Sequence, residues 1–392
     1  MRIGLFTDSY YPHISGVSTS IAMLKNALEE MGHTVYIVAP SKKYSYDKKN
    51  RIIWIPGIKP GFYEIRIAKT YSIRAMKIIK NEWKLDIIHT QTELSIDIFA
   101  RHIAKKLNIP VIRTYHTFYE DCIDYVTKGH FDNFAKKVLV KLTKDYCEKK
   151  CDELIVPTEK IKNIFNNKYN IKRDMWIIPT GIDIKRFYKT NSLKKKGKEI
   201  RNKYNIKDDD FVIGTVGRIA FEKNFDKTIL NVKDLVKIND KIKLMLVGTG
   251  PDLEKLKAMV KDLKLEDKII FTGLVEYDDI PMYYQAFDVM TSYSTFETQG
   301  LTIIEALAGS IPVVCINDPS FSSMVQNNYN GYLFNNDDEF KKYILKLFAD
   351  KELYNKMCIN AKNSTYSYSK EVFASNVLKV YHHALENKKN NK

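Results

Sequence analysis

Short apolar strands alternate with amphipathic helices along almost the whole chain, and this alternation constrains the fold more than any other feature. Arg2–Thr7 has the pattern of a strand, about Val17–Met31 that of a helix, and Thr34–Val38 that of the next strand. Asp86–His89 and Val111–Tyr115 are further β-branched runs, separated by helical patterns. Because parallel strands need long crossover connections, this order predicts a doubly wound α/β sheet.

The alternation stops at Asn191–Lys198, a polar and basic stretch without periodicity, and then starts again. Later strands are expected at Phe211–Val216, Lys243–Val247, Ile269–Phe271, Val289–Ser292 and Ile311–Cys315, and helices at Asn224–Lys237 and Asp252–Leu263. The 392 residues exceed the ~250–300 at which one hydrophobic core stops growing. We therefore expect two Rossmann-like domains, 1–190 and 199–368, and a final helix, 369–388, that packs back on the first.

Several protein classes are disfavoured by features that the sequence lacks. It has no run of ~18 apolar residues that could span a membrane, and its first residues lack the apolar core of a secretory signal, so we expect a cytoplasmic protein. Five scattered cysteines favour reduced thiols over a zinc site. The glycine-rich signatures of dinucleotide enzymes and P-loop NTPases are absent.

The positive charge is concentrated in the first half of the chain. Residues 1–190 contain 33 Lys and Arg against 20 Asp and Glu, a net charge of +13, out of +16 for the whole sequence. The remaining residues therefore carry only +3. This asymmetry predicts an anionic partner for the first domain, such as nucleic acid, an acidic ligand or an anionic membrane.

Two glutamates eight positions apart flank an expected helix start in the second half. Glu297 follows a strand, Gly300 precedes the helix, and Glu305 lies within the helix. Free N–H groups and the helix dipole at such a start form a phosphate site, and the two carboxylates can bind hydroxyl groups on either side of a diphosphate. The alternative is that Glu305 is an ordinary solvated residue on the polar side of a packed helix.

Two basic residues follow the first strand of the second half. Arg218 and Lys223 lie in the segment VGRIAFEKN, at the entrance to the next helix. A guanidinium and an ammonium group can neutralise an anionic leaving group as its bond breaks. Alternatively, both are plain surface residues in a lysine-rich chain.

Together, the segments VGRIAFEKN and FETQGLTIIEALAGSIPVV resemble the retaining, two-domain nucleotide-sugar glycosyltransferases of family 4, which have the GT-B fold. The resemblance implies two Rossmann-like domains that face a deep interdomain cleft. It also implies that the first glutamate contacts the donor sugar, the second the ribose, and the two cations the diphosphate. The family uses no metal ion for the diphosphate, so we expect neither a metal nor a cofactor besides the donor.

Weaker matches extend the resemblance to both halves. Gly16 lies in a loop similar to the family's Gly-Gly-Val loop, with Ser15 in place of the first glycine, and His116 matches a histidine near the donor sugar. A lone histidine after a strand can also be purely structural. The expected catalytic residues are His116, Arg218, Lys223 and Glu297, and the expected donor-binding residues are Gly16, Gly217, Gly250, Gly300, Leu301, Thr302 and Glu305.

The basic first half bears on the acceptor. Phe134–Lys150 is either a core-packed helix with a solvated basic face or a helix that docks on anionic lipid. Basic and aromatic residues between Lys59 and Lys77 favour the second interpretation, docking on lipid. Within the family, the opening GLFTDSYYPHISGVSTSI most resembles that of enzymes that glucosylate diacylglycerol. This similarity implies transfer of glucose from UDP-glucose to 1,2-diacylglycerol, at the inner face of the plasma membrane.

Two alternatives remain open. The hexose or the acceptor could differ, with phosphatidylinositol, a polyprenyl-linked sugar or a soluble sugar in place of diacylglycerol. A basic nucleic-acid-binding protein is disfavoured, because the surplus charge is mostly lysine spread over a domain, without patterned arginine and aromatic base contacts. We therefore expect no nucleic-acid partner.

Overall fold

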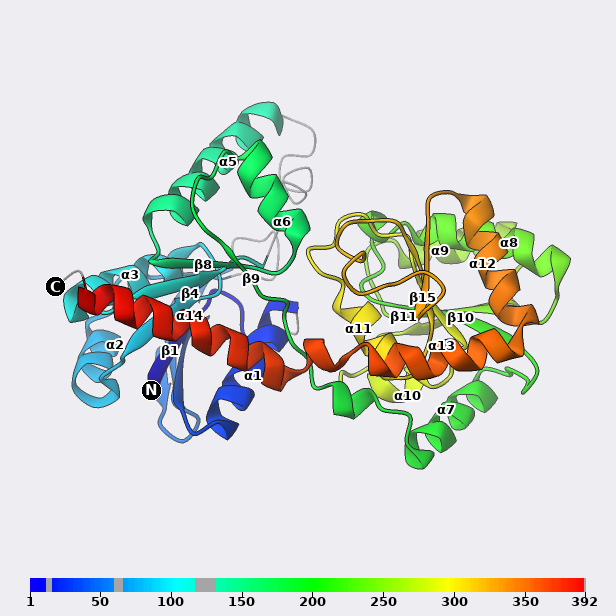
Figure 1. Cartoon of the computed structure of the whole chain (residues 1–392), viewed down its shortest axis with the longest axis horizontal. Helices are drawn as coiled ribbons and strands as arrows, with labels where there is room; N and C mark the ends of the chain where they lie inside the picture. Colours follow the sequence, from blue (N-terminus) through cyan, green and yellow to red (C-terminus); the bar gives the residue numbers. More distant parts are fainter. Residues whose placement is uncertain (12–15, 60–65, 117–131, 391–392) are drawn as a thin grey trace. The chain divides into compact units, whose positions relative to one another are not determined.

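The computed structural model describes residues 1–11, 16–59, 66–116 and 132–390, and only the backbone of 132–137 and 139. The chain divides into two compact units. The first consists of Met1–Gly181 and Lys370–Lys392, and the second of Ile182–Ser369. Figure 1 shows the helices and strands of both units.

The first unit is built on a mostly parallel sheet with the order β3-β4-β2-β1-β6-β7-β8-β9, in which β3 and β5 pair antiparallel with β4. The strands are β1 (Arg2–Phe6), β2 (Thr34–Ser41), β3 (Ser45–Asp47), β4 (Ile52–Ile58), β5 (Ile67–Ala68), β6 (Ile87–Thr90), β7 (Val111–Thr114), β8 (Glu153–Val156) and β9 (Trp176–Ile177). The helices are α1 (Gly16–Glu30), α2 (Ile73–Ile78), α3 (Ser95–Leu107), α5 (Asp132–Lys149), α6 (Glu159–Asn163) and α14 (Lys370–Asn390).

The final helix, α14, is part of the first unit's core. It lies against α1 (Figure 1). Phe373, Val377 and Tyr381 are buried in one cluster with residues of β1 and α1. Burying one such side chain contributes roughly 1.5–3 kcal/mol, so docking of α14 stabilises the first unit. Lys370 adds an ion pair with Glu30 at 2.6 Å.

The second unit has a fully parallel six-stranded sheet with the order β12-β11-β10-β13-β14-β15. Its strands are β10 (Phe211–Val216), β11 (Ile242–Val247), β12 (Ile269–Gly273), β13 (Val289–Ser292), β14 (Val313–Ile316) and β15 (Gly331–Phe334). Its helices are α7 (Asn191–Lys203), α8 (Phe225–Ile238), α9 (Leu253–Asp262), α10 (Ile280–Tyr284), α11 (Leu301–Ala308), α12 (Asp337–Ala349) and α13 (Lys351–Asn363). Strands β11 and β12 follow one another on one side of β10, whereas β13, β14 and β15 follow one another on its other side. The strand order therefore switches between β10 and β13, and doubly wound sheets bind ligands at the carboxyl ends of the strands at such a switch point.

One expectation for this unit is wrong. The segment Asn191–Lys198, expected to lack regular structure, forms most of helix α7. Thr190 caps this helix by accepting a hydrogen bond from the Leu193 N–H at 3.2 Å. Only Gly197 and Ile200 of α7 are buried. The sequence of the helix therefore lacks the apolar residues at every third or fourth position by which an amphipathic helix is recognised.

Candidate active site

The carboxyl ends of β10, β11 and β13 bring the predicted loops of the second unit together. β10 and β11 run in register to Val216 and Val247, and the pairing continues as the Gly217 N–H donates to the Val247 carbonyl at 3.0 Å. Gly250 lies so close to the next loop that a Cβ there would be 2.2 Å from the Ile219 carbonyl oxygen. Only glycine allows this backbone approach, so Gly250 sets the spacing of the two loops.

The structure pairs two of the predicted catalytic residues, Lys223 and Glu297. Their side chains form an ion pair and are largely buried, with 27% and 19% of their surfaces exposed. Asn224 holds the two loops together, because its amide donates to the Tyr293 carbonyl at 3.0 Å. Arg218 is exposed and has no ion-pair partner in the described part of the chain. Its guanidinium group is thus available to an anionic ligand.

Helix α11 starts at the predicted position. Gly300 precedes it with φ +82°, where a Cβ would lie 2.5 Å from the ring of Phe321. Both the backbone angle and the contact require glycine. Leu301 and Thr302 form the first turn and are partly exposed. The N–H groups at such a start have no partner within the helix, and the dipole there attracts anions.

Glu305 is buried, so the interpretation as an ordinary solvated residue is wrong. Only 7% of its surface is exposed, and its Oε2 accepts a hydrogen bond from the Tyr284 hydroxyl at 2.7 Å. Burial raises the pKa of Glu305 to about 7, although the Tyr284 hydrogen bond and the charge of Arg186 act in the opposite direction. A carboxylate that is buried and has a raised pKa indicates a specific binding partner or a functional role. The sequence pattern did not indicate Tyr284.

His116 follows β7 in the first unit and is hydrogen-bonded to Gln91. Its Nε2 lies 2.7 Å from Oε1 of Gln91, which can only accept, so Nε2 carries the proton. Burial lowers the pKa of His116 to about 4, so the ring is neutral at pH 7. Nδ1 therefore presents a lone pair that can accept a hydrogen bond. Gln91 is a second residue that sequence reasoning missed.

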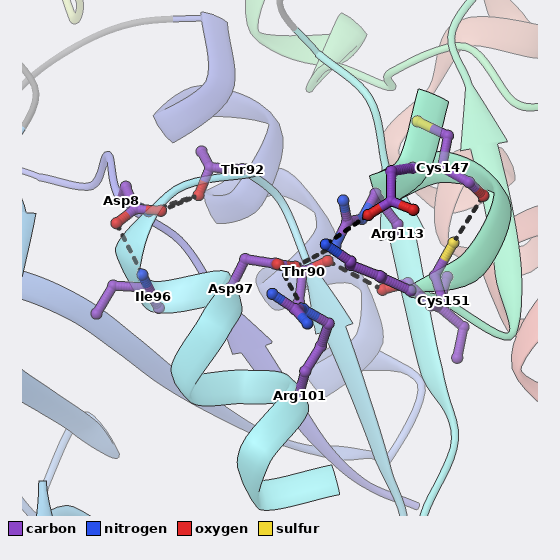
Figure 2. Close-up of polar contacts among 12 residues, drawn as sticks. Asp8, Thr90, Thr92, Ile96, Asp97, Arg101, Arg113, Cys147 and Cys151 are labelled. Atoms are coloured by element: carbon purple, nitrogen blue, oxygen red, sulfur yellow. Dashed lines mark hydrogen bonds and ion pairs between the residues drawn. The ribbon is translucent and has the colours of Figure 1, made fainter. Parts of the chain in front are cut away.

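Buried polar contacts connect helix α3 to strand β7 and to the segments that follow β1 and β6 (Figure 2). Arg113, on β7, forms a fully buried ion pair with Asp97 of α3. Asp8, directly after β1, accepts hydrogen bonds from the Thr92 hydroxyl at 2.8 Å and the Ile96 N–H at 2.9 Å. Since these bonds join the segments after β1 and β6 to α3, they hold the carboxyl edge of the sheet in one arrangement.

The first unit also contains a pocket of about 600 Å³ at this edge. It is lined by Asp8, Ser9, Tyr10, Tyr11, Pro40, Ser41, Lys42, Ser45, Trp54, Lys59 and Arg66. The rings of Tyr10 and Trp54 are 6.2 Å apart and form an aromatic wall. Aromatic residues directly after the first strand were the available signal for this pocket. Gly16 is the exposed first residue of α1, whereas the neighbouring Ser15 lies outside the described residues.

Among the described residues, no group of three or more His, Cys, Asp or Glu side chains is arranged to hold a metal ion. Cys147, Cys151, Cys315 and Cys358 are free thiols. Within the same part of the chain, no helix combines the length and apolarity needed to cross a bilayer.

The fold defines the class of this protein. Anabaena Alr3699/HepE in complex with UDP is similar to it, with a TM-score of 0.75 at 15% identity, over 98% of this chain and 100% of that one. The architecture is that of the GT-B glycosyltransferases, and the expected fold class is confirmed.

The family follows from closer relatives. Models described as Glycosyltransferase Family 4 and Glycosyl transferases group 1 match residues 14–186 and 196–364. The alpha-monoglucosyldiacylglycerol synthase of Streptococcus pneumoniae is 35% identical over 97% of this chain and 85% of its own length. The synthase of the same name from Acholeplasma laidlawii is 36% identical over 100% of this chain and 99% of its own length. The chain belongs to glycosyltransferase family 4, as its motifs predict, and is a glycosyltransferase.

Proposed function

We propose that this enzyme transfers glucose from UDP-glucose to the free hydroxyl of 1,2-diacylglycerol, with retention, to give an α-glucosyl glycolipid. The observation that carries this proposal is the 35% and 36% identity, over nearly the whole chain, to two alpha-monoglucosyldiacylglycerol synthases. Sequence similarity of this extent includes both units, so it covers donor and acceptor sides alike.

In the proposed donor site, the diphosphate lies against the start of α11, and Arg218 and Lys223 neutralise its charge. Glu297 orients the sugar, while Glu305 accepts hydrogen bonds from the ribose. Lys223 is paired with Glu297 in the structure, so the diphosphate competes with a carboxylate for the same ammonium group. Two cations and a helix dipole supply the charge neutralisation that a divalent metal ion would otherwise provide, and we propose a metal-independent reaction.

The chemistry we propose proceeds on one face of the sugar. The bond from C1 of glucose to the β-phosphate oxygen breaks, and the bond from C1 to the acceptor oxygen forms on the same side. The acceptor proton passes to the departing phosphate oxygen, so UDP leaves with the proton. His116 accepts a hydrogen bond from a sugar hydroxyl through Nδ1, since its Nε2–H is held by Gln91.

The pocket at the carboxyl edge of the first sheet is our candidate for the lipid acceptor. Its aromatic wall, Tyr10 and Trp54, suits the glycerol backbone and the first acyl carbons. Lys42 and Arg66 line the same pocket and can donate hydrogen bonds to ester carbonyl groups.

Exposed apolar side chains beside basic residues support a membrane-facing surface. Ile58, Ile67, Tyr71 and Ile73 are between 47% and 73% exposed, in the same segment as several lysines and arginines. On α5, Val138 and Leu142 are 42% and 49% exposed, whereas the helix buries Thr143 and Cys147. Val138 and Leu142 are thus not packed in the core. Each lysine or arginine near an anionic membrane contributes about 1 kcal/mol, and we propose peripheral binding at the inner face of the plasma membrane.

The decisive experiment is a transfer assay with purified protein and radiolabelled UDP-glucose or UDP-galactose. Vesicles of anionic phospholipid are supplied with and without diacylglycerol, and EDTA is added in a parallel set. We expect label in the lipid phase only with UDP-glucose and diacylglycerol, unchanged by EDTA, and released by an α-glucosidase. Transfer to another acceptor, or a requirement for a divalent ion, would contradict the respective part of the proposal. Binding to duplex DNA in a salt titration would instead support a nucleic-acid role.

A further inference from the structure

Tyr284 is a fully buried tyrosine whose hydroxyl reaches a predicted donor-binding residue. It ends the short helix α10, and its ring packs edge-on against Phe187 and Phe287, with centroids 5.7 Å away in both cases. These contacts leave the ring little freedom, so the position of its hydroxyl is defined. That hydroxyl lies 2.7 Å from Oε2 of Glu305 and 3.2 Å from the carbonyl oxygen of Thr302.

The carboxylate that Tyr284 contacts has few other partners. In the described part of the chain, Glu305 makes one side-chain hydrogen bond, to Tyr284, and Oε1 makes none. Arg186 is the cation that acts on it, from the 3₁₀ turn Ile184–Phe187, and that guanidinium group also bonds Asp278 at 3.0 Å. A buried carboxylate gains or loses much from a single hydrogen bond, because desolvation opposes its charge.

We propose that Tyr284 is a positioning residue for donor binding: its hydroxyl occupies Oε2 of Glu305 and so directs Oε1 toward the ribose hydroxyls. The inference rests on the proposed role of Glu305 toward the ribose. Tyr284 does not touch the nucleotide in this scheme; it acts through Glu305. Its contact with Thr302 places the same hydroxyl beside the first turn of α11, which the diphosphate is proposed to occupy.

The test is Tyr284→Phe, which keeps the buried ring and removes only the hydroxyl. Affinity for UDP is measured by calorimetry on the full chain, and again for 2′-deoxy-UDP and 3′-deoxy-UDP. We expect the variant to bind UDP about ten-fold more weakly, the usual size for losing a hydrogen bond to a charged group. For the deoxy-nucleotide that lacks the hydroxyl bound by Glu305, the loss should shrink to less than about two-fold, because effects that act through one contact are not additive.

Tyr283→Phe is the matched control. Tyr283 is adjacent, and its hydroxyl interacts with Tyr204 rather than with Glu305. We expect this variant to bind all three nucleotides as the wild type does. In kinetic assays, Tyr284→Phe should raise KM for UDP-glucose about ten-fold and leave kcat within about two-fold.

Unchanged UDP affinity in Tyr284→Phe would overturn the inference, and so would an equal loss for UDP and both deoxy-nucleotides, which indicates a purely structural role. The pH dependence of UDP-glucose binding gives a second measurement, whose midpoint does not depend on the absolute affinity. Without the hydroxyl, only Arg186 stabilises the ionised Glu305, so the midpoint of binding should move to higher pH. A wild-type protein that does not bind UDP at all would instead overturn the proposed function itself.

Discussion

Binding of UDP-glucose should depend on pH through Glu305, whose pKa is raised to about 7 by burial. The proposed ribose contact needs the ionised carboxylate, because a ribose hydroxyl donates a hydrogen bond to it. Affinity should therefore rise as pH increases through about 7. UDP-glucose has no group of its own that titrates near neutrality, and the eight histidines all lie outside residues 182–369. Glu305 is thus the group in the second unit to which a transition near pH 7 is assigned.

The magnitude follows from the pKa. At about pH 5.5, roughly 1.5 units below it, about 3% of Glu305 is ionised, so affinity should fall about 30-fold, or about 2 kcal/mol. The assay is calorimetric titration with UDP-glucose, without acceptor, between about pH 5.5 and pH 8.5. Glu305→Gln is the control and should bind weakly but without this transition. A flat wild-type profile, or a transition that persists in Glu305→Gln, would refute the assignment.

Four substitutions test other parts of the site. Lys223→Ala and Glu297→Ala should each reduce glucose transfer by at least about 100-fold, which is the scale of losing one group that stabilises transition-state charge. Binding to vesicles, measured by sedimentation, should not change. Loss of both glucose transfer and vesicle binding would point to a folding role instead. Gly300→Ala should lower the free energy of unfolding by about 1–2 kcal/mol because of the φ of +82° alone, and the clash with Phe321 should lower it further. It should also weaken UDP binding. Thermal melts and calorimetry measure these two effects, and an unaltered protein would contradict the structural requirement for glycine at this helix start. Trp54→Ala should raise KM for diacylglycerol in mixed micelles several-fold and leave KM for UDP-glucose unchanged, and the reverse pattern would exclude the acceptor pocket.

The sequence predicts the central strands of both sheets, because buried parallel strands are continuous apolar runs, but it did not indicate strands such as β4, β8 and β15. Phe211–Val216 and Val289–Ser292 have the observed bounds. Helix α7 could not be predicted from periodicity, since its packing depends on one small glycine and one isoleucine, and Gly197 lies against the backbone of Gln285. The local sequence of α7 does not indicate its contact with Gln285.

The candidate site was predictable only where neighbouring residues share a segment. Glu297 and Gly300 are placed by a strand and a helix start, so their motif indicates their positions. Tyr284 and Gln91, by contrast, reach Glu305 and His116 from other segments, 21 and 25 residues away in the chain. Such contacts arise from tertiary packing. The catalytic and donor-binding roles themselves stay predictions.

The placement of α14 has a consequence for synthesis. Phe373, Val377 and Tyr381 complete a core whose other members begin at Ile3. During translation, the ribosome must therefore finish the whole of residues 182–369 before the opening strands receive their last partner. The unit whose synthesis begins first therefore completes its core last, and until α14 is made, the apolar surface that α14 covers stays exposed.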